Sequence, residues 1–284
     1  MSARRRPPGD YPPTEHLLRD LGLWTEAFAD PPRAGLEVVP ALCDGAGALA
    51  MGPLAVLVDV LAGGSALAAA EGGWIATSDL QLSLLGSGGP GDAVAESRVL
   101  RAGRSSVVLE VSVARAGAPV ALATVAFARL ATEGAFQRGA IAAAPAGARH
   151  RFSDTGAQLD EPFERALGFE WQRDRAVLPV RAYVGNSLGA IQGGVVAAFC
   201  AFAAERAVAG TGAARASDLG VHFLALGRQG PMEARPRIVR QRGGNATVRV
   251  ELVDRGAGDR LCAVATAQIP LPAPLPGEGA TSAR

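Results

Sequence analysis

The sequence predicts an α+β protein made of two tandem copies of one domain. Residues 44–55, DGAGALAMGPLA, align with residues 186–197, NSLGAIQGGVVA, which places Gly47 and Gly189 142 positions apart. In each copy a long apolar helical segment follows this stretch, and four strand-like segments follow the helix. A helix that is apolar nearly all round must be wrapped by other structure, and a curved antiparallel sheet meets that need.

The elements of the two copies correspond in order. Helices are expected at about 51–70 and 193–209, each preceded by a short strand, at 36–39 and 177–184. Alternating apolar residues and short glycine-rich turns predict the meander strands. These strands are expected near 74–86, 92–102, 105–116 and 119–131 in the first copy, and near 214–226, 232–242, 246–254 and 260–269 in the second.

The repeat also suggests a division of the chain into domains. We expect an N-terminal domain over 14–131 and a C-terminal domain over 161–270, joined by a linker over 132–160 that contains few large apolar residues. Residues 1–13 and 271–284 are rich in proline, glycine and alanine, which is typical of loose tails.

Composition and charge exclude several classes of protein. The chain is 49% apolar and 19% charged with a net charge of +1, which is unlike a disordered chain and offers no basic excess for binding nucleic acid. All basic residues are arginine, so mechanisms that need a lysine Schiff base or a P-loop lysine are excluded.

Cysteine and histidine usage argues against metal and disulfide chemistry. The three cysteines (Cys43, Cys200 and Cys262) lie far apart, and no histidines are paired at ligand spacing, so we expect no zinc site, no cofactor and a reducing cytoplasm. The basic N-terminus has no apolar segment after it, so we expect no signal peptide there. The long apolar stretch 46–70 has Asp59 near its middle, so we expect a buried helix rather than a membrane span.

The segment that begins at Asn186 resembles the start of the long helix in hotdog-fold acyl-CoA thioesterases of the phenylacetate-pathway (PaaI-like) type. The pattern of that family is Asn, then Gly, then His-Gly-Gly, then an Asp nine residues after the His. The resemblance extends over about 34–131 and 175–269, and it implies a double hotdog that hydrolyses acyl-CoA. It further implies an active site built across the two halves, and it is compatible with a homo-oligomer of such chains.

The second half keeps one part of the family pattern. Asn186 matches the family Asn, Gln192 stands where His is usual, and Gly193 matches the glycine whose N–H polarises the thioester carbonyl. The acidic position is occupied by Ala201, so the resemblance implies no acid in this half.

The first half keeps the complementary part. Asp59 occupies the acidic position, and Thr77 matches a family position that often carries a hydroxyl beside the acid. Asp44, Ala50 and Met51 replace the Asn, the His and the glycine. The two halves together therefore predict one composite site of Asp59, Thr77, Asn186, Gln192 and Gly193, in which Asp59 is either base or nucleophile.

Two other functions remain open from the sequence. A non-catalytic acyl-CoA-binding protein is one, and a serine esterase is the other, because Gly185-x-Ser187-x-Gly189 fits a nucleophile elbow. The esterase needs a histidine after Ser187, and His222 is the only one. Four arginines near glycine-rich turns are candidates for the CoA phosphates, although a solvated surface explains them equally well. They are Arg101, Arg104, Arg240 and Arg242.

Overall fold

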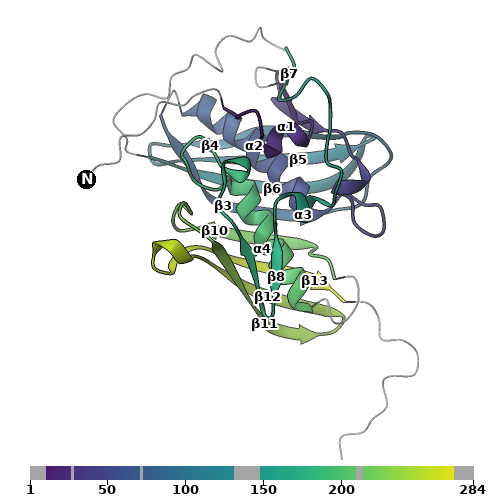
Figure 1. Ribbon diagram of the computed structural model, residues 1–284. Helices are drawn as coiled ribbons and strands as arrows, with labels where there is room; N and C mark the ends of the chain where they lie inside the picture. Colours follow the sequence, from purple (N-terminus) through teal and green to yellow (C-terminus); the bar gives the residue numbers. More distant parts are fainter. Residues whose placement is uncertain (1–10, 27–28, 71–72, 131–147, 209–213, 272–284) are drawn as a thin grey trace, which may run out of the picture.

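The computed structural model describes residues 11–26, 29–70, 73–130, 148–208 and 214–271, and in them thirteen strands form one antiparallel sheet (Figure 1). The strand order is β7-β1-β2-β4-β5-β6-β3-β10-β13-β12-β11-β9-β8. In the first half the strands are β1 (Trp24–Glu26), β2 (Arg33–Leu36), β3 (Ile75–Leu84), β4 (Ala93–Ala102), β5 (Ser106–Arg115), β6 (Ala118–Arg129) and β7 (His150–Arg151). In the second half they are β8 (Glu170–Gln172), β9 (Arg175–Leu178), β10 (Asp218–Phe223), β11 (Met232–Arg242), β12 (Asn245–Asp254) and β13 (Arg260–Pro270).

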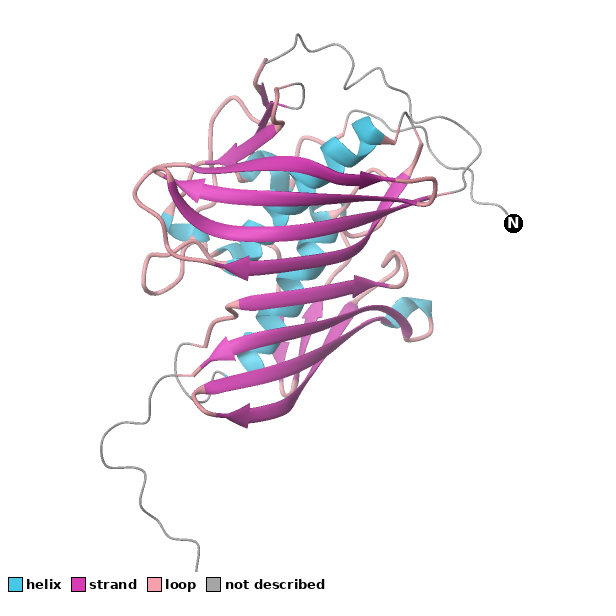
Figure 2. Cartoon of the chain, turned by 180° about the vertical axis from the view of Figure 1, so that it is seen from behind, coloured by secondary structure: helices cyan, strands magenta, loops and turns pink. Residues whose placement is uncertain are grey.

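The two half-sheets are joined by one pair of strands. β3 and β10 pair antiparallel with Asp79 opposite His222, and this pairing makes the two half-sheets continuous. The long helices α2 (Met51–Ala69) and α4 (Gly193–Val208) lie on the same side of that sheet (Figure 2). The predicted α+β double-hotdog architecture is therefore present, with all of its meander strands.

Glycines let the two long helices approach closely. A Cβ added at Gly194 lies 2.6 Å from the carbonyl oxygen of Ala55, so only glycine fits there. At the corresponding place on α2, a Cβ on Gly52 lies 2.8 Å from the Phe163 ring and 3.4 Å from the Cβ of Ala198 on α4. α2 is long and apolar enough to cross a membrane by length and composition, but 67% of its most apolar window is buried inside the fold.

The short strands predicted before each long helix are misplaced. β2 and β9 end at Leu36 and Leu178, and 3-10 turns occupy 40–42 and 182–184 instead. Proline explains the difference in part, because Pro179 follows β9 directly and Pro40 begins the first turn, and proline cannot donate to a strand ladder. Two helical turns that the sequence did not reveal, α1 (Leu17–Asp20) and α3 (Phe163–Ala166), come before these strands.

The predicted tails and linker lie largely outside the described residues, which exclude 1–10, 131–147 and 272–284. The described end of the linker belongs to the first half of the sheet, because β7 pairs with β1 and Leu21 bridges to Ala157. The exact domain limits stay a prediction.

Candidate active site

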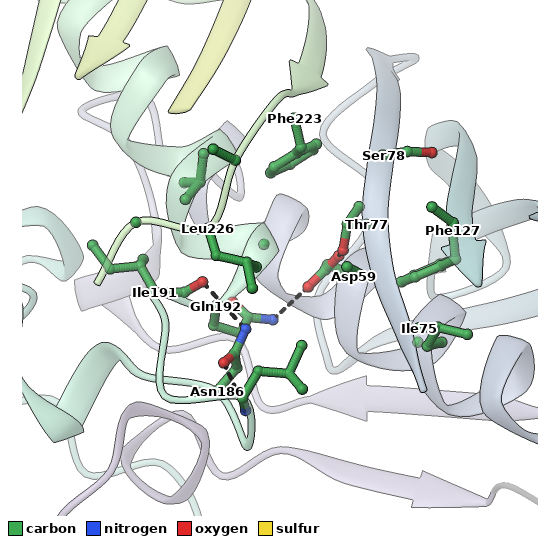
Figure 3. A pocket seen from close by; sticks show the side chains of 18 of the residues that line it. Asp59, Ile75, Thr77, Ser78, Phe127, Asn186, Ile191, Gln192, Phe223 and Leu226 are labelled. Atoms are coloured by element: carbon green, nitrogen blue, oxygen red, sulfur yellow. Dashed lines mark hydrogen bonds between the residues drawn. The ribbon is translucent and has the colours of Figure 1, made fainter. Parts of the chain in front are cut away.

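A cavity of about 340 Å³ lies between the two halves. Its first-half wall comes from one face of α2, the start of β3 and the end of β6, and its second-half wall comes from the start of α4 and the loop after β10. Ile75 and Phe127 stand on one side, and Ile191, Phe223 and Leu226 stand on the other (Figure 3). Every predicted catalytic residue lines this cavity: Asp59, Thr77, Asn186, Gln192 and Gly193.

Asp59 is held by hydrogen-bond donors from both halves. It sits in the middle of α2 and is 7% exposed. The Thr77 hydroxyl donates to its Oδ1 at 2.9 Å, and the Gln192 amide Nε2 donates to its Oδ2 at 2.8 Å (Figure 3). The second bond crosses from the second half to the first, so the carboxylate is oriented by both halves at once.

A β-bulge aims Thr77 at the carboxylate. In β3, Thr77 pairs with Phe127 and Asp79 pairs with Ala126, which leaves Ser78 as the extra residue. Side chains of a regular strand alternate between its two faces. Because Leu80 is buried on the inner face, Thr77, three residues earlier, would then point to the outer face. The extra residue reverses that phase and turns Thr77 toward α2.

Gln192 is locked at the start of α4. Its Oε1 accepts the N–H of Val195 at 2.9 Å, which caps the helix, and its backbone N–H donates to the Val184 carbonyl. Because an amide oxygen must be the acceptor there, the NH₂ end faces Asp59, and one of its two hydrogens is committed to that carboxylate.

Gly193 allows the close approach of all these groups. A Cβ at this position lies 2.7 Å from the Thr77 hydroxyl oxygen and 2.8 Å from Oδ1 of Asp59. A larger residue therefore cannot occupy position 193 without displacing the carboxylate or the hydroxyl.

Burial changes the ionisation of Asp59. Removal from water raises the pKa of its carboxyl to about 6, while the bonds from Thr77 and from the Gly194 N–H act in the opposite direction. The N-terminus of α4, with its partial positive charge, also faces this carboxylate. Asp59 is therefore mainly ionised at neutral pH, and its pKa lies close enough to neutral pH for the carboxylate to accept a proton during the reaction.

Asn186 shapes the loop before α4. Its Oδ1 accepts the N–H groups of Leu188 and Ala190 at 2.9 and 3.1 Å, and its Nδ2 donates to the Ile191 carbonyl at 3.4 Å. The side chain lines the cavity, but these three bonds fold the loop and do not reach Asp59. In the first half Asp44 makes the same two loop bonds, to Ala46 and Ala48.

The pseudo-equivalent place in the other half has lost this chemistry. Ala201 stands where Asp59 would be, and Asp44 forms an ion pair with Arg215. Glu205, the repeat counterpart of Gly63, accepts the N–H of Ala216, the counterpart of Thr77. A cavity of only about 20 Å³ remains beside these residues.

The geometry excludes the serine esterase hypothesis, in which His222 would activate Ser187. Ser187 lines the cavity, but His222 is on the opposite face of the sheet from the cavity-lining Phe223, because neighbouring strand residues point to opposite sides. The His222 ring is engaged with Asp79 at 2.6 Å. His222 therefore cannot activate Ser187.

The four candidate arginines do not line the cavity. Arg101 lies on β4, which β5 and β6 separate from β3, and Arg104 is in the turn that follows β4. Arg240 and Arg242 lie at the far end of β11, whose first residue, Met232, is the one that lines the cavity. The structure brings none of them to the carboxylate.

The contribution of the loop between β10 and β11 to the cavity was not predicted from the sequence. The buried carboxylate of Asp254 accepts the N–H groups of Arg228, Gln229 and Gly230, and the Gly227 carbonyl accepts the N–H of Ile191. These bonds fix the second-half wall of the cavity. No signal in the single sequence marks them, because Asp254 and the loop meet only through the fold.

The N-terminal segment also supports the site. The His16 ring accepts the Leu18 N–H at Nδ1, so its Nε2 carries the hydrogen and donates to the Gly185 carbonyl at 2.9 Å. A usable sequence signal exists here, because Leu21-Gly22 and Leu167-Gly168 extend the repeat toward the N-terminus of each half. Within the described residues, no group of histidine, cysteine or acidic side chains is arranged to hold a metal ion.

Comparisons with known proteins agree with this arrangement. The acyl-CoA thioesterase N-terminal domain family matches residues 185–269, and no curated protein matches the chain. A proposed thioesterase II from Thermobifida fusca is 21% identical with a TM-score of 0.56, covering 85% of this chain and 92% of that chain. The tesB protein of Mycobacterium avium subsp. paratuberculosis is 16% identical with a TM-score of 0.56, covering 85% and 93%.

A third similar structure is a conserved protein of unknown function with the hotdog fold from Alicyclobacillus acidocaldarius. It is 15% identical with a TM-score of 0.53, and the match covers 86% of this chain and 94% of that chain. At these identities the structures show the fold alone. Residues 185–269 of this chain are therefore similar to the acyl-CoA thioesterase N-terminal domain, and the chain as a whole has the hotdog fold of these structures, in two tandem copies.

Proposed function

We propose that this chain hydrolyses acyl-CoA at one composite site, with Asp59 and Thr77 from the first half and Gln192 and Gly193 from the second. The observation that carries the proposal is the 2.8 Å hydrogen bond from Gln192 to Asp59, which joins the two halves inside a cavity. The lost acid at Ala201 supports a single site per chain.

Asp59 is proposed as the general base. Asp59 accepts hydrogen bonds from Thr77, from Gln192 and from the Gly194 N–H, which leaves one of its about four lone-pair sites for a water molecule. The carboxylate takes a proton from that water, and the resulting hydroxide adds to the thioester carbonyl carbon. The tetrahedral adduct then collapses, the C–S bond breaks, and the proton held by Asp59 passes to the departing CoA thiolate, which restores the carboxylate. Turnover in isotopically labelled water tests this role, because label in the Asp59 carboxyl itself indicates a nucleophile instead.

Carbonyl polarisation is assigned to the start of α4. The first N–H groups of a helix have no partner within the helix, and Gly193 carries no side chain that would keep the carbonyl away. The second hydrogen on Nε2 of Gln192 is a further donor. Fixed donors of this kind are each worth about 10²–10³ in rate.

Thioesterase assays with a panel of acyl-CoA substrates test the proposal. Asp59→Asn should lower kcat by about 10² or more, because the amide cannot accept the proton. Asn186→Ala should cost less, and Ser187→Ala should be nearly silent. Asp44→Asn is the matched control, since it keeps the loop bonds in the half without an acid. Binding of acyl-CoA without any turnover would favour the non-catalytic alternative, and a dead Ser187→Ala beside an active Asp59→Asn would overturn the assignment.

Three further expectations, on subfamily, location and assembly, accompany this proposal. A PaaI-like relationship is supported by the Asn186 to Gly194 pattern. A cytoplasmic location is supported by three free cysteines, of which Cys200 and Cys262 are buried. A homo-oligomer is suggested by the family resemblance, and measuring the mass in solution tests it.

A further inference from the structure

The cavity has a buried end and an exposed rim. Ile75 and Phe127, from β3 and β6, are almost fully buried, whereas Ser187 and Leu224, from the two second-half loops, are exposed. Leu224 in particular is 56% exposed. Because the CoA moiety is large and charged, it must stay at the rim, so the acyl group is the part of the substrate that enters the buried end.

The buried end follows one face of α2. Asp59, Gly63 and Leu67 all line the cavity, and their spacing of four residues places them one above another on the helix. The eight steps along the chain from Asp59 to Leu67 cover about 12 Å of helix axis. Buried Ile75 and Phe127 and half-buried Trp74 and Leu130 complete the wall, and all of these are apolar or largely apolar side chains. A medium-chain aliphatic acyl group suits this length and lining.

Gly63 stands at the middle of that path. A Cβ placed on it meets nothing closer than the Phe127 ring at 3.8 Å, so the missing side chain leaves free space rather than filling a tight helix contact. The absence of a side chain costs helix stability, because glycine is about 1 kcal/mol poorer than alanine inside a helix. This free space leaves room for an acyl group beside α2.

The other half of the chain serves as an internal comparison. Glu205 occupies the position that corresponds to Gly63, and its carboxyl is bonded to the Ala216 N–H. Only about 20 Å³ of cavity remains beside it. The open path thus coincides with the half that keeps the catalytic carboxylate.

We propose that Gly63 determines the acyl-chain length that this site accepts, by leaving open an apolar channel for medium-chain acyl groups between α2 and the Phe127 side of the sheet. This inference rests on the proposed function, since it assigns the acyl group of the same site. A β-branched side chain at 63 closes the channel beyond Asp59 and leaves the carboxylate, Thr77 and Gln192 in place.

The experiment compares Gly63→Val with Gly64→Val. Both variants put the same residue into the same helix, but Gly64 lies outside the cavity and has open space around it. With Gly63→Val, kcat/KM for decanoyl-CoA should fall about 10-fold or more, in line with the cost of a misfitted apolar group, while butyryl-CoA stays within about threefold. Gly64→Val should leave the ratio between the two substrates unchanged, and thermal unfolding confirms that both variants fold.

Binding of CoA thioethers separates this inference from the proposed function. Gly63→Val should weaken S-decyl-CoA about 10-fold or more and leave S-butyl-CoA unchanged, whether or not the protein turns over thioesters. Selective loss of decyl binding in a protein without thioesterase activity would overturn the proposed function and keep the channel. Equal effects of the two valine variants, or equal losses on long and short chains, would overturn the role of Gly63.

Discussion

Asp59 is a carboxyl group whose charge depends on pH in the physiological range. Burial raises its pKa to about 6, so the group is mainly protonated at about pH 5 and mainly ionised at about pH 8. Because the base form is the ionised one, kcat/KM should rise with pH through a midpoint near 6. The pH dependence of acyl-CoA hydrolysis measures this midpoint.

Thr77→Val provides the control for that midpoint. The Thr77 hydroxyl bonds the charged form of Asp59, so its removal should move the midpoint to higher pH as well as lower the rate. A profile that stays flat between about pH 5 and pH 8 would contradict Asp59 as the base.

Glu205 makes a separate prediction about stability. Burial raises the pKa of its carboxyl to about 7, well above its unfolded value of 4.5. For a group whose folded pKa is raised, the stability contribution is present below the unfolded pKa and is lost as pH rises through the folded pKa. Glu205→Gln keeps an oxygen for the Ala216 N–H but does not titrate.

The stability of Glu205→Gln relative to the unmodified protein should therefore increase as pH rises from about 5 to about 8. Urea unfolding of both proteins across this range measures the difference. A constant difference at every pH would show that Glu205 ionises normally in the folded protein.

At the scale of elements, the bulge in β3 joins sheet geometry to catalysis. Deleting Ser78 restores regular pairing with β6 and turns Thr77 to the outer face, so activity should fall at least as far as in Thr77→Val. Ser78→Ala removes only the bond from the serine hydroxyl to the Ala126 carbonyl and should keep most activity. Acyl-CoA hydrolysis, with folding checked by thermal unfolding, compares the three variants. A deletion variant more active than Thr77→Val would show that the bulge does not orient Thr77.

Much of the fold could be predicted from the repeat, because periodicity and glycine-rich turns are local. The helices α2 and α4 begin at the predicted residues, 51 and 193. The pairing of Asp59 with Gln192 came from complementary losses in the two copies. The bulge at Ser78 could not be predicted, because it exists only relative to the partner strand β6. The loop held by Asp254 and the bond from His16 to the Gly185 carbonyl depend on contacts between distant segments, which one sequence does not reveal.

At the scale of the whole molecule, the site depends on two halves of a single chain. Mixing an Asp59→Asn protein with a Gly193→Val protein should restore no activity, because each chain supplies both parts of its own site and each variant spoils one. The measurement is hydrolysis by the mixture against the sum of the separate proteins. Activity well above that sum would mean that halves from different chains pair with each other.

The covalent link between the halves has a consequence for how the sequence can change. In a symmetric pair of identical subunits, every substitution appears twice, so a residue that helps one site also alters the second site, which is related to it by the two-fold axis. Here Gly63 and Glu205 are separate positions, as are Asp59 and Ala201. One copy is therefore free to keep the reaction and the room for a substrate, while the other accumulates residues that only need to pack, and each position is selected for a single task.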